Sequence, residues 1–218
     1  MTPPPPRLLP LGDAAFSLVL GPSVDPATEA RVVALGRAIG AARLPGVIET
    51  VPAYTTLTVH YDPLVIDAAT LRDGLRSLLA GPLETETGSG GRLVELPVRY
   101  DGPDLSEVAA RVGISTDEVV ARHLAREYRV VLLGFVPGFA YLAELDPSLV
   151  LPRRQEPRTR VPAGSVAIAG AQTGIYPSAT PGGWHLIGST PAALFVPNRD
   201  PPNLLAVGDR VRFVRAAG

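Results

Sequence analysis

Four arginines stand close together in the segment LPRRQEPRTRVP, residues 151–162. Each guanidinium group is a planar fork of hydrogen-bond donors that suits a carboxylate or a phosphate. Four such cations repel one another unless anions lie between them, so some are expected to face a small anionic ligand or a protein partner. A solvated arginine surface is the alternative explanation. The four residues are Arg153, Arg154, Arg158 and Arg160.

Polar and aromatic side chains follow the arginines in two glycine-rich stretches, AGSVAIAGAQTGIYP and TPGGWHLIG. Glycine lets the backbone approach a ligand closely, and Tyr and Trp combine an apolar face with a polar tip. Ser165 does not lie in a G-x-S-x-G elbow, so we expect it to hydrogen-bond an oxyanion rather than act as a nucleophile. Gln172, Tyr176 and Trp184 are expected to line a cleft. A core position would explain Trp184 equally well.

His123 is a candidate for acid–base chemistry. It falls within an expected helix that begins with a capping box, in which Glu118 follows Ser115 by three residues. Imidazole has the side-chain pKa closest to neutrality, which suits a general acid or base, or a hydrogen bond to a ligand. A histidine that caps a helix carbonyl or pairs with Glu127 would explain the same position without any chemistry.

Tyr141 belongs to the signature GFVPGFAYL at residues 134–142. The glycines of this segment are expected to define turns. Phe135 and Phe139 are expected in the core, and Tyr141 is the residue of the segment that we place at the ligand site. We therefore expect His123, Tyr141, Gln172 and the arginines to approach one cleft.

The composition excludes several kinds of site. The chain has no cysteine and no lysine, since all 20 of its Lys+Arg residues are arginine. A thiolate nucleophile, a cysteine-bound zinc, a phosphate-loop lysine and a biotinyl-lysine are thereby excluded from this chain. His, Asp and Glu show no clear metal-ligand spacing, so we expect no tightly held metal.

Charge and hydropathy point to a small-molecule or protein partner. The net charge is −1 and no long block of like charge occurs, so neither nucleic acid nor a membrane surface is expected as a partner. No run of about 18 uninterrupted apolar residues, as a spanning helix would need, is present. We expect a cytoplasmic protein.

The elements that must position these residues fall into two expected domains. In residues 1–85 the pattern is strand, helix, strand, strand, helix, which resembles a split βαβ or ferredoxin-like unit that a further strand would complete. Asp25-Pro26 and Asp67 begin the two helices. The segment ETETGSGG at 84–91 is typical of a flexible linker, and we place the linker between the two domains at 86–91. The second domain is expected to span residues 92–218.

Short apolar runs dominate the second expected domain from Tyr128 onward. Glycine- and proline-containing turns separate them, which favours a closed antiparallel barrel over a parallel sheet. The runs are YRVVLLGFV, SVAIAG, WHLIG, AALFV and DRVRFV.

The motifs resemble those of the KipI/5-oxoprolinase B-subunit family, also called allophanate hydrolase subunit 1 and a carboxyltransferase subdomain. LGDAA at 11–15, GVIETVPAYTTLTVHYDP at 46–63 and PVRYDGPDL at 97–105 are similar to the family as well, and the resemblance covers nearly the whole chain. It implies an α+β protein with a small ferredoxin-like α/β N-terminal domain followed by a cyclophilin-like β-barrel domain. It also implies functional roles for His123 and for the PRRxxPR pattern.

The resemblance implies one component of an ATP-dependent 5-oxoprolinase, which opens the lactam of 5-oxoproline to glutamate. A lactam carbonyl is a poor electrophile, and phosphorylation of its oxygen would activate it for attack by water. ATP would be used by the complex, and the companions would be the KipA-like C subunit and the LamB/YcsF-like A subunit of the enzyme. The isolated chain is expected to be inactive. The alternative is a regulatory binding protein that, like KipI, inhibits a sensor histidine kinase.

Overall fold

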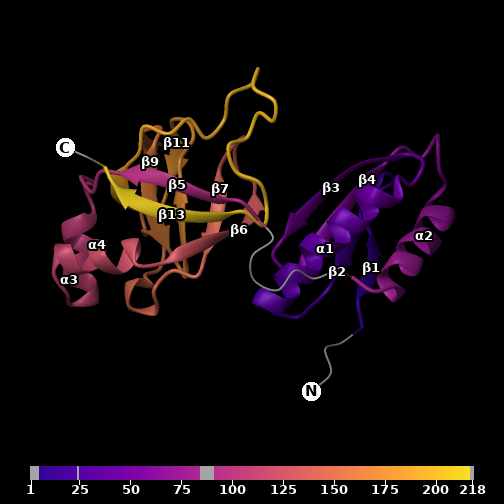
Figure 1. The fold of residues 1–218 in the computed structure, drawn as a ribbon, viewed down its shortest axis with the longest axis horizontal. Helices are drawn as coiled ribbons and strands as arrows, with labels where there is room; N and C mark the ends of the chain where they lie inside the picture. Colours follow the sequence, from indigo (N-terminus) through magenta and orange to yellow (C-terminus); the bar gives the residue numbers. More distant parts are fainter. Residues whose placement is uncertain (1–4, 24, 84–90, 217–218) are drawn as a thin grey trace. The chain divides into compact units, whose positions relative to one another are not determined.

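The computed structural model describes residues 5–23, 25–83 and 91–216, and the chain divides into two compact units, residues 1–90 (unit 1) and residues 91–218 (unit 2) (Figure 1). Of the linker expected at 86–91, only Gly91 lies among the described residues. None of the described helices is both long enough and apolar enough to cross a bilayer.

Unit 1 is an antiparallel sheet covered by two helices. Its strands are in the order β1-β2-β4-β3. Phe16, Leu18, Leu57 and Val59 of the sheet share one buried cluster with residues of both helices, so the helices lie on the same face (Figure 1). The elements are β1 (Arg7–Pro10), β2 (Ala15–Val19), α1 (Pro26–Ala42), β3 (Val47–Ala53), β4 (Thr56–Tyr61) and α2 (Ala68–Ala80).

Local chemistry explains where both helices of unit 1 begin. The Asp25 carboxylate accepts a hydrogen bond from the N–H of Thr28 at 2.9 Å, and the Asp67 carboxylate accepts from the N–H groups of Ala69 and Thr70 at 3.0 and 2.9 Å. Each satisfies N–H groups that a helix start leaves without partners. Both predicted helix starts are therefore confirmed.

The edge of the sheet in unit 1 differs from the ferredoxin-like expectation. That arrangement takes its fourth strand from the chain after the second helix. Among the described residues of unit 1 no strand follows α2, and β1 pairs with β2 at this edge, with Leu8 opposite Leu18. The edge strand is therefore β1, which precedes the predicted strand-helix-strand-strand-helix pattern in the sequence.

Unit 2 is built on a strongly curved, mostly antiparallel sheet in the order β5-β13-β6-β7-β10-β9-β12, with β11 and β8 as a separate pair. Helices α3 and α4 connect β5 to β6. The elements are β5 (Leu93–Val98), α3 (Leu105–Val112), α4 (Thr116–Leu124), β6 (Glu127–Leu133), β7 (Ala140–Ala143), the 3-10 turn η1 (Pro147–Leu149), β8 (Arg158–Val161), β9 (Ser165–Ala169), β10 (Gln172–Ile175), β11 (Thr180–Gly182), β12 (His185–Ser189) and β13 (Arg210–Arg215).

The named strands of unit 2 do not form the closed antiparallel barrel that the sequence predicts. β13 pairs with β5 in parallel, with Arg210 opposite Leu93. The ladder ends at β5 and β12, whose ends are joined by an isolated bridge in which Arg99 and Ser189 exchange backbone hydrogen bonds of 2.8 and 2.7 Å. Alternating hydrophobicity shows that a strand has a buried face, but not which strand lies beside it or in which direction.

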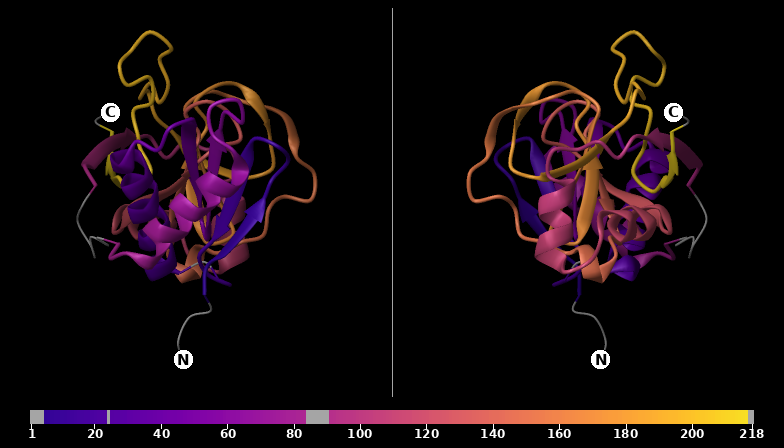
Figure 2. Two further views of the ribbon diagram at one scale, coloured as in Figure 1. Left: turned by 90° about the vertical axis from the view of Figure 1, so that its right-hand side faces the viewer. Right: turned by 90° about the vertical axis from the view of Figure 1, so that its left-hand side faces the viewer.

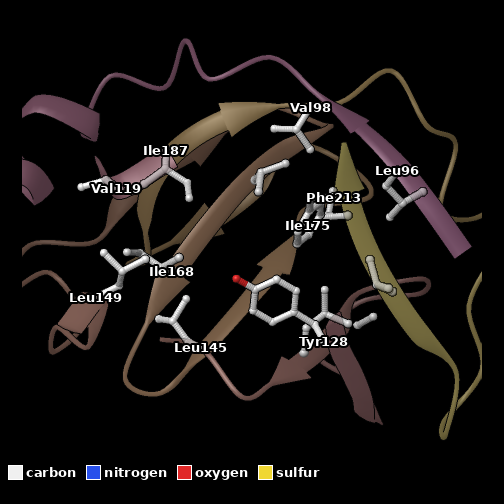
Figure 3. Close-up of a cluster of buried hydrophobic side chains, with 14 of the residues drawn as sticks. Leu96, Val98, Val119, Tyr128, Leu145, Leu149, Ile168, Ile175, Ile187 and Phe213 are labelled. Carbon is white, nitrogen blue, oxygen red and sulfur yellow. The ribbon is translucent and has the colours of Figure 1, made fainter. Parts of the chain in front are cut away.

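Both faces of β9 are buried, which divides the interior of unit 2 into two clusters. Val166 and Ile168 belong to the larger core, in which Figure 3 shows Ile168 together with Tyr128 and Phe213. Ala167 and Ala169 point to the other face and contact a second cluster that contains aromatic residues. Successive side chains of a strand alternate between faces, so neighbouring residues of β9 and β10 face the two clusters in turn.

A long loop between β12 and β13 extends away from the sheet of unit 2 (Figure 2). It doubles back on itself, because Phe195 and Asn203 form an isolated antiparallel bridge. The N–H of Leu204 donates to the carbonyl of Leu194 at 2.8 Å next to that bridge. The base of the loop is thereby fixed beside the turn that contains Gly138.

Candidate functional site

The arginine segment, residues 152–160, is fastened to the start of α3 by Asp104. Both terminal nitrogens of Arg158 donate to the two Asp104 carboxylate oxygens, at 2.9 and 2.6 Å, and Arg154 donates to one of them at 3.2 Å. The N–H of Leu186 in β12 donates to the same carboxylate at 2.7 Å. Bidentate pairing of this kind fixes both the position and the plane of the guanidinium.

Asp104 is an ionised group with little contact with water. The residue is only 3% exposed. Burial raises the pKa of its carboxyl, but hydrogen bonds from Arg158 and from the Leu186 N–H, together with the charges of both arginines, outweigh that effect and leave the pKa below its ordinary value. The sequence-based site did not include Asp104. Asp104 lies in the segment PVRYDGPDL, which resembles the family, and that resemblance was the one signal in the sequence that could have pointed to it.

The four arginines have different roles in the structure. Arg154 also reaches Glu107 of α3, at 3.1 Å, so Arg154 and Arg158 are both committed to carboxylates of this chain. Arg153 and Arg160 are exposed. Within the described part of the chain, neither side chain has a hydrogen bond or an ion pair. The expectation that carboxylates lie between the cations thus holds for Arg154 and Arg158. Arg153 and Arg160 face solvent instead.

Tyr176 and Trp184 belong to the aromatic cluster, defined here as Phe135, Phe139, Tyr141, Tyr176 and Trp184. The Phe139 ring lies edge-on to Tyr176 and Trp184, with centroids 5.2 and 5.5 Å apart. Tyr176 is 2% exposed and Trp184 is 5% exposed. Of the two explanations for Trp184, the structure therefore favours the core position.

The Gly182-Gly183 pair lies between the aromatic cluster and the arginine segment. A side chain at Gly182 would collide with the Tyr176 hydroxyl. The carbonyl of Gly183 accepts a hydrogen bond from the N–H of Arg154 at 2.8 Å. Burial raises the pKa of the Tyr176 hydroxyl, and the backbone N–H of Trp184 and the charge of Arg153 oppose that shift only in part. The two glycines thus bring the segment close to Tyr176.

Tyr141 and Gln172 share a face with the aromatic cluster. In the antiparallel pair of β7 and β10, Tyr141 lies opposite Gly174, and Gln172 lies opposite Ala143. Tyr141 and Gln172 are therefore diagonal neighbours on one face of the sheet. Both side chains are half-buried. The absence of a side chain at Gly174 leaves room for the rings of Phe139 and Trp184.

His123 lies on the opposite face, inside the larger core, and is fully buried. The Thr173 hydroxyl donates to the carbonyl of Ala167 at 2.9 Å, so it accepts from the Nε2–H of His123, also at 2.9 Å. Nδ1 of His123 then accepts from the hydroxyl of Tyr100 at 2.7 Å. Burial lowers the pKa of His123 to about 3.

The prediction that His123 joins the arginines in one cleft therefore needs correction. His123 contacts Thr173, which points into the larger core. Its neighbours in β10, Gln172 and Gly174, point to the opposite face, where the aromatic cluster lies. The His123 ring also stacks on Phe213, with centroids 4.7 Å apart. With both nitrogens engaged and the imidazole neutral, His123 orders the core instead of meeting a ligand. The alternative partner Glu127 does not apply, since Glu127 pairs with Arg210 and Arg212.

Two further polar residues are engaged within the chain. The Ser165 hydroxyl, 2.8 Å from the carbonyl of Pro162, donates to it, so its hydrogen is not available to a ligand in this arrangement. His185 is fully buried, and its Nε2–H donates to the carbonyl of Pro152 at 2.9 Å. His185 thus holds the first residue of the arginine segment. Its Nδ1 has no hydrogen-bond partner among the described residues.

The structure thus brings together Tyr141, Gln172, Tyr176 and Trp184 on one face, with the arginine segment beside Tyr176. Within this set, the polar groups open to a small anion are the exposed Arg153 and Arg160 and the half-buried Tyr141 and Gln172, whereas Tyr176 and Trp184 support them from the core. Among the described residues there is no group of three or more His, Asp or Glu side chains that could hold a metal ion.

Comparisons with known proteins cover almost the full chain. The profile of the family described as carboxyltransferase domain, subdomain C and D, matches residues 6–205. The chain is 43% identical to the B subunit of 5-oxoprolinase from Bacillus subtilis, over 94% of this chain and 90% of that protein. It is 46% identical to the protein of the same name from Escherichia coli, over 94% and 93%.

A solved structure has the same fold. The crystal structure of TTHA0988 superposes with a TM-score of 0.85 at 48% sequence identity and covers 94% of this chain. The chain spans 40% of the length of that larger protein. The likeness therefore concerns one part of TTHA0988 and nearly all of the present chain.

Proposed function

The chain belongs to the family of the carboxyltransferase domain, subdomain C and D, and we propose that it serves as the B subunit of a 5-oxoprolinase. The observation that carries this proposal is the 43% and 46% identity to two proteins of that name across 94% of the chain. Such a complex opens the lactam ring of 5-oxoproline to give glutamate. The kinase-regulator alternative is not favoured, because the similar proteins are named as enzyme subunits.

The contribution of this chain to the reaction is binding and orientation. Its exposed cations and its aromatic cluster can hold a small acid, whereas His123 and the Ser165 hydroxyl are engaged inside the fold. We therefore propose that groups which activate the lactam come from two companions, the KipA-like C subunit and the LamB/YcsF-like A subunit. The complex would consume ATP to activate the lactam carbonyl, whose oxygen is a poor leaving group without phosphorylation.

Reconstitution tests this proposal. Glutamate release from 5-oxoproline and ATP is measured with the purified chain alone, with each companion, and with both. We expect turnover only when the companions are present. Full turnover by the single chain would overturn its role as one component of a larger enzyme, and no turnover in any combination would overturn the assignment to a 5-oxoprolinase.

A further inference from the structure

A tight turn holds the exposed Phe135 away from the sheet. The N–H of Gly134 donates to the carbonyl of Phe139 at 3.2 Å, and the N–H of Phe139 donates to the carbonyl of Val136 at 3.0 Å. Gly138, at φ 85°, has its Cα packed against Phe195, where only glycine fits without strain. The turn is therefore fixed at both of its ends.

Phe135 departs from the core position that the sequence predicts for it. Its backbone φ is 69°, in the left-handed region that a bulky side chain rarely adopts. The residue is also exposed, with 59% of its surface accessible to solvent. The cost of that conformation must be met by the surrounding structure, and residues held in this way are concentrated at functional sites.

The exposed ring of Phe135 is nevertheless held in place. It stands edge-on to Phe139, with centroids 5.5 Å apart and an interplanar angle of 82°, and to Tyr176, at 6.4 Å and 88°. Both supporting rings are buried. Phe135 therefore offers a preorganised apolar surface to something outside the fold, with little side-chain entropy left to lose on binding.

Arg153 is a cation close enough to the same Tyr176 for its charge to oppose the rise in the pKa of the Tyr176 hydroxyl. Arg153 is exposed, and within the described residues no carboxylate pairs with it. The next residue, Arg154, is fixed through its N–H to Gly183, and the preceding Pro152 through its carbonyl to His185. The backbone is thus held on both sides of Arg153, while the charge on its side chain remains available.

We propose that Phe135 and Arg153 form the substrate subsite of this chain for a small lactam acid. Arg153 pairs with the carboxylate, and Phe135 covers the apolar CH2–CH2 edge of the ring. The assignment rests on the function proposed above and deepens it. It gives substrate binding to Arg153 and not to Arg154 and Arg158, which pair with carboxylates of this chain. Those two arginines, with Asp104, position the segment and do not touch the substrate.

The chemistry of the two residues selects this ligand class. A five-membered lactam acid carries one carboxylate next to two adjoining methylenes, so it needs one cation and one small apolar surface. A guanidinium pairs with a carboxylate through two parallel hydrogen bonds. An aromatic ring removes methylenes from water. A ligand without the carboxylate, or without the apolar edge, would use only half of the subsite.

The test uses the complex reconstituted from this chain and both companions. For Arg153→Ala we expect KM for 5-oxoproline to rise about 10- to 100-fold, the effect of one lost charge-assisted contact, with kcat little changed. For Phe135→Ala we expect a rise of about 10-fold, which corresponds to two methylenes left in water. Assembly, measured by size-exclusion chromatography, is expected to remain that of the wild type.

The primary amide of the same lactam acid provides the second measurement. In the wild type, the neutral amide is expected to show a higher KM than the acid. In Arg153→Ala that difference should disappear, whereas in Phe135→Ala it should persist. Arg76→Ala and Leu64→Ala are the matched controls, because Arg76 has a side chain that is 64% exposed and Leu64 is a 95% exposed residue in unit 1.

The outcomes separate the two proposals. A wild-type complex that releases glutamate, with variants of unchanged KM, would overturn the subsite and leave the proposed function standing. Weakened assembly by Phe135→Ala, with an unchanged KM in the complex that still forms, would show that Phe135 contacts a companion protein, which also overturns the subsite. A wild-type complex that releases no glutamate would remove the proposed function, and the lactam-acid subsite with it.

Discussion

Arg158 and Asp104, 54 residues apart in sequence, face each other as a two-point ion pair with N–O distances of 2.9 and 2.6 Å. The carboxylate is 4% exposed and the arginine side chain 26%. The pair connects the arginine segment to α3, so its loss affects both a buried charge and the shape of the proposed site.

Asp104→Asn should destabilise the chain by roughly 2 to 3 kcal/mol. The amide can still accept from the Leu186 N–H, but Arg158 loses its counter-charge and Arg154 keeps only Glu107; a fully buried pair would cost ~3–5 kcal/mol. Urea unfolding at pH 7 measures the change. Glu118→Gln is the control, because it breaks the exposed Arg122–Glu118 pair and should cost less than about 0.5 kcal/mol. Equal effects of the two substitutions would contradict the role given to Asp104.

Stability should fall as the pH is lowered below 6.5, because of His123. Its pKa drops from 6.5 to about 3 on folding, so the unfolded chain binds a proton that the folded chain does not. Between pH 6.5 and 5 the loss should approach about 1.4 kcal/mol per pH unit. The lowered pKa of Asp104 acts in a separate window, below its ordinary value of 3.8.

Urea unfolding at pH 7, 6 and 5 measures this loss in the wild type and in His123→Gln, in which the slope should be much reduced. Nitrogen NMR of the imidazoles gives an independent check, with His123 expected to remain the neutral Nε2–H tautomer down to about pH 4. An imidazole at this position that titrates near 6.5 would contradict the structure.

Tyr100→Phe should destabilise the chain by roughly 1 to 3 kcal/mol. The substitution removes the hydroxyl, 2.7 Å from Nδ1 of His123, and leaves a buried acceptor without a donor. The pH slope assigned to His123 should persist in this variant, because the imidazole stays buried. Thermal unfolding of Tyr100→Phe, compared with the wild type, detects the loss. An unchanged Tm would show that water replaces the hydroxyl.

Gly182→Ala should destabilise the chain by roughly 1 to 3 kcal/mol, since the added methyl group meets the Tyr176 hydroxyl in a packed site. Gly40→Ala in α1 is the matched control. Among the described residues, nothing beyond its chain neighbours and the backbone of α1 lies within 4 Å of the position that its methyl group would take, and alanine is favoured over glycine by about 1 kcal/mol within a helix. The two substitutions should therefore shift Tm in opposite directions.

Signals within a few residues were enough to predict the helices. Asp25, Asp67 and Ser115 each cap a helix as expected, because a cap depends on its immediate neighbours. The buried position of His123 also had a local signal. Val119 precedes it by four residues and both lie on the buried side of α4, so the helical spacing placed the histidine on the core face.

Long-range relationships were not predictable in the same way. Asp104 meets arginines 50 and 54 residues away, and β5 pairs with β13 across 117 residues, as Arg210 opposite Leu93 shows. No local propensity records which distant segment completes an ion pair or a sheet edge. The exposure of Phe135 could not be predicted either, since an aromatic residue beside a glycine can lie in the core or in a turn at the surface.

Trp184 is the one tryptophan among the 218 residues, and it lies directly after the glycines that join Tyr176 to the arginine segment. Indole emission responds to local polarity and to nearby charge. Tryptophan emission, excited selectively over that of the six tyrosines, consequently originates at a single known place, beside the proposed subsite. Titration of the chain with a small acid would thus report occupancy optically, without any attached label and before the companion proteins are added.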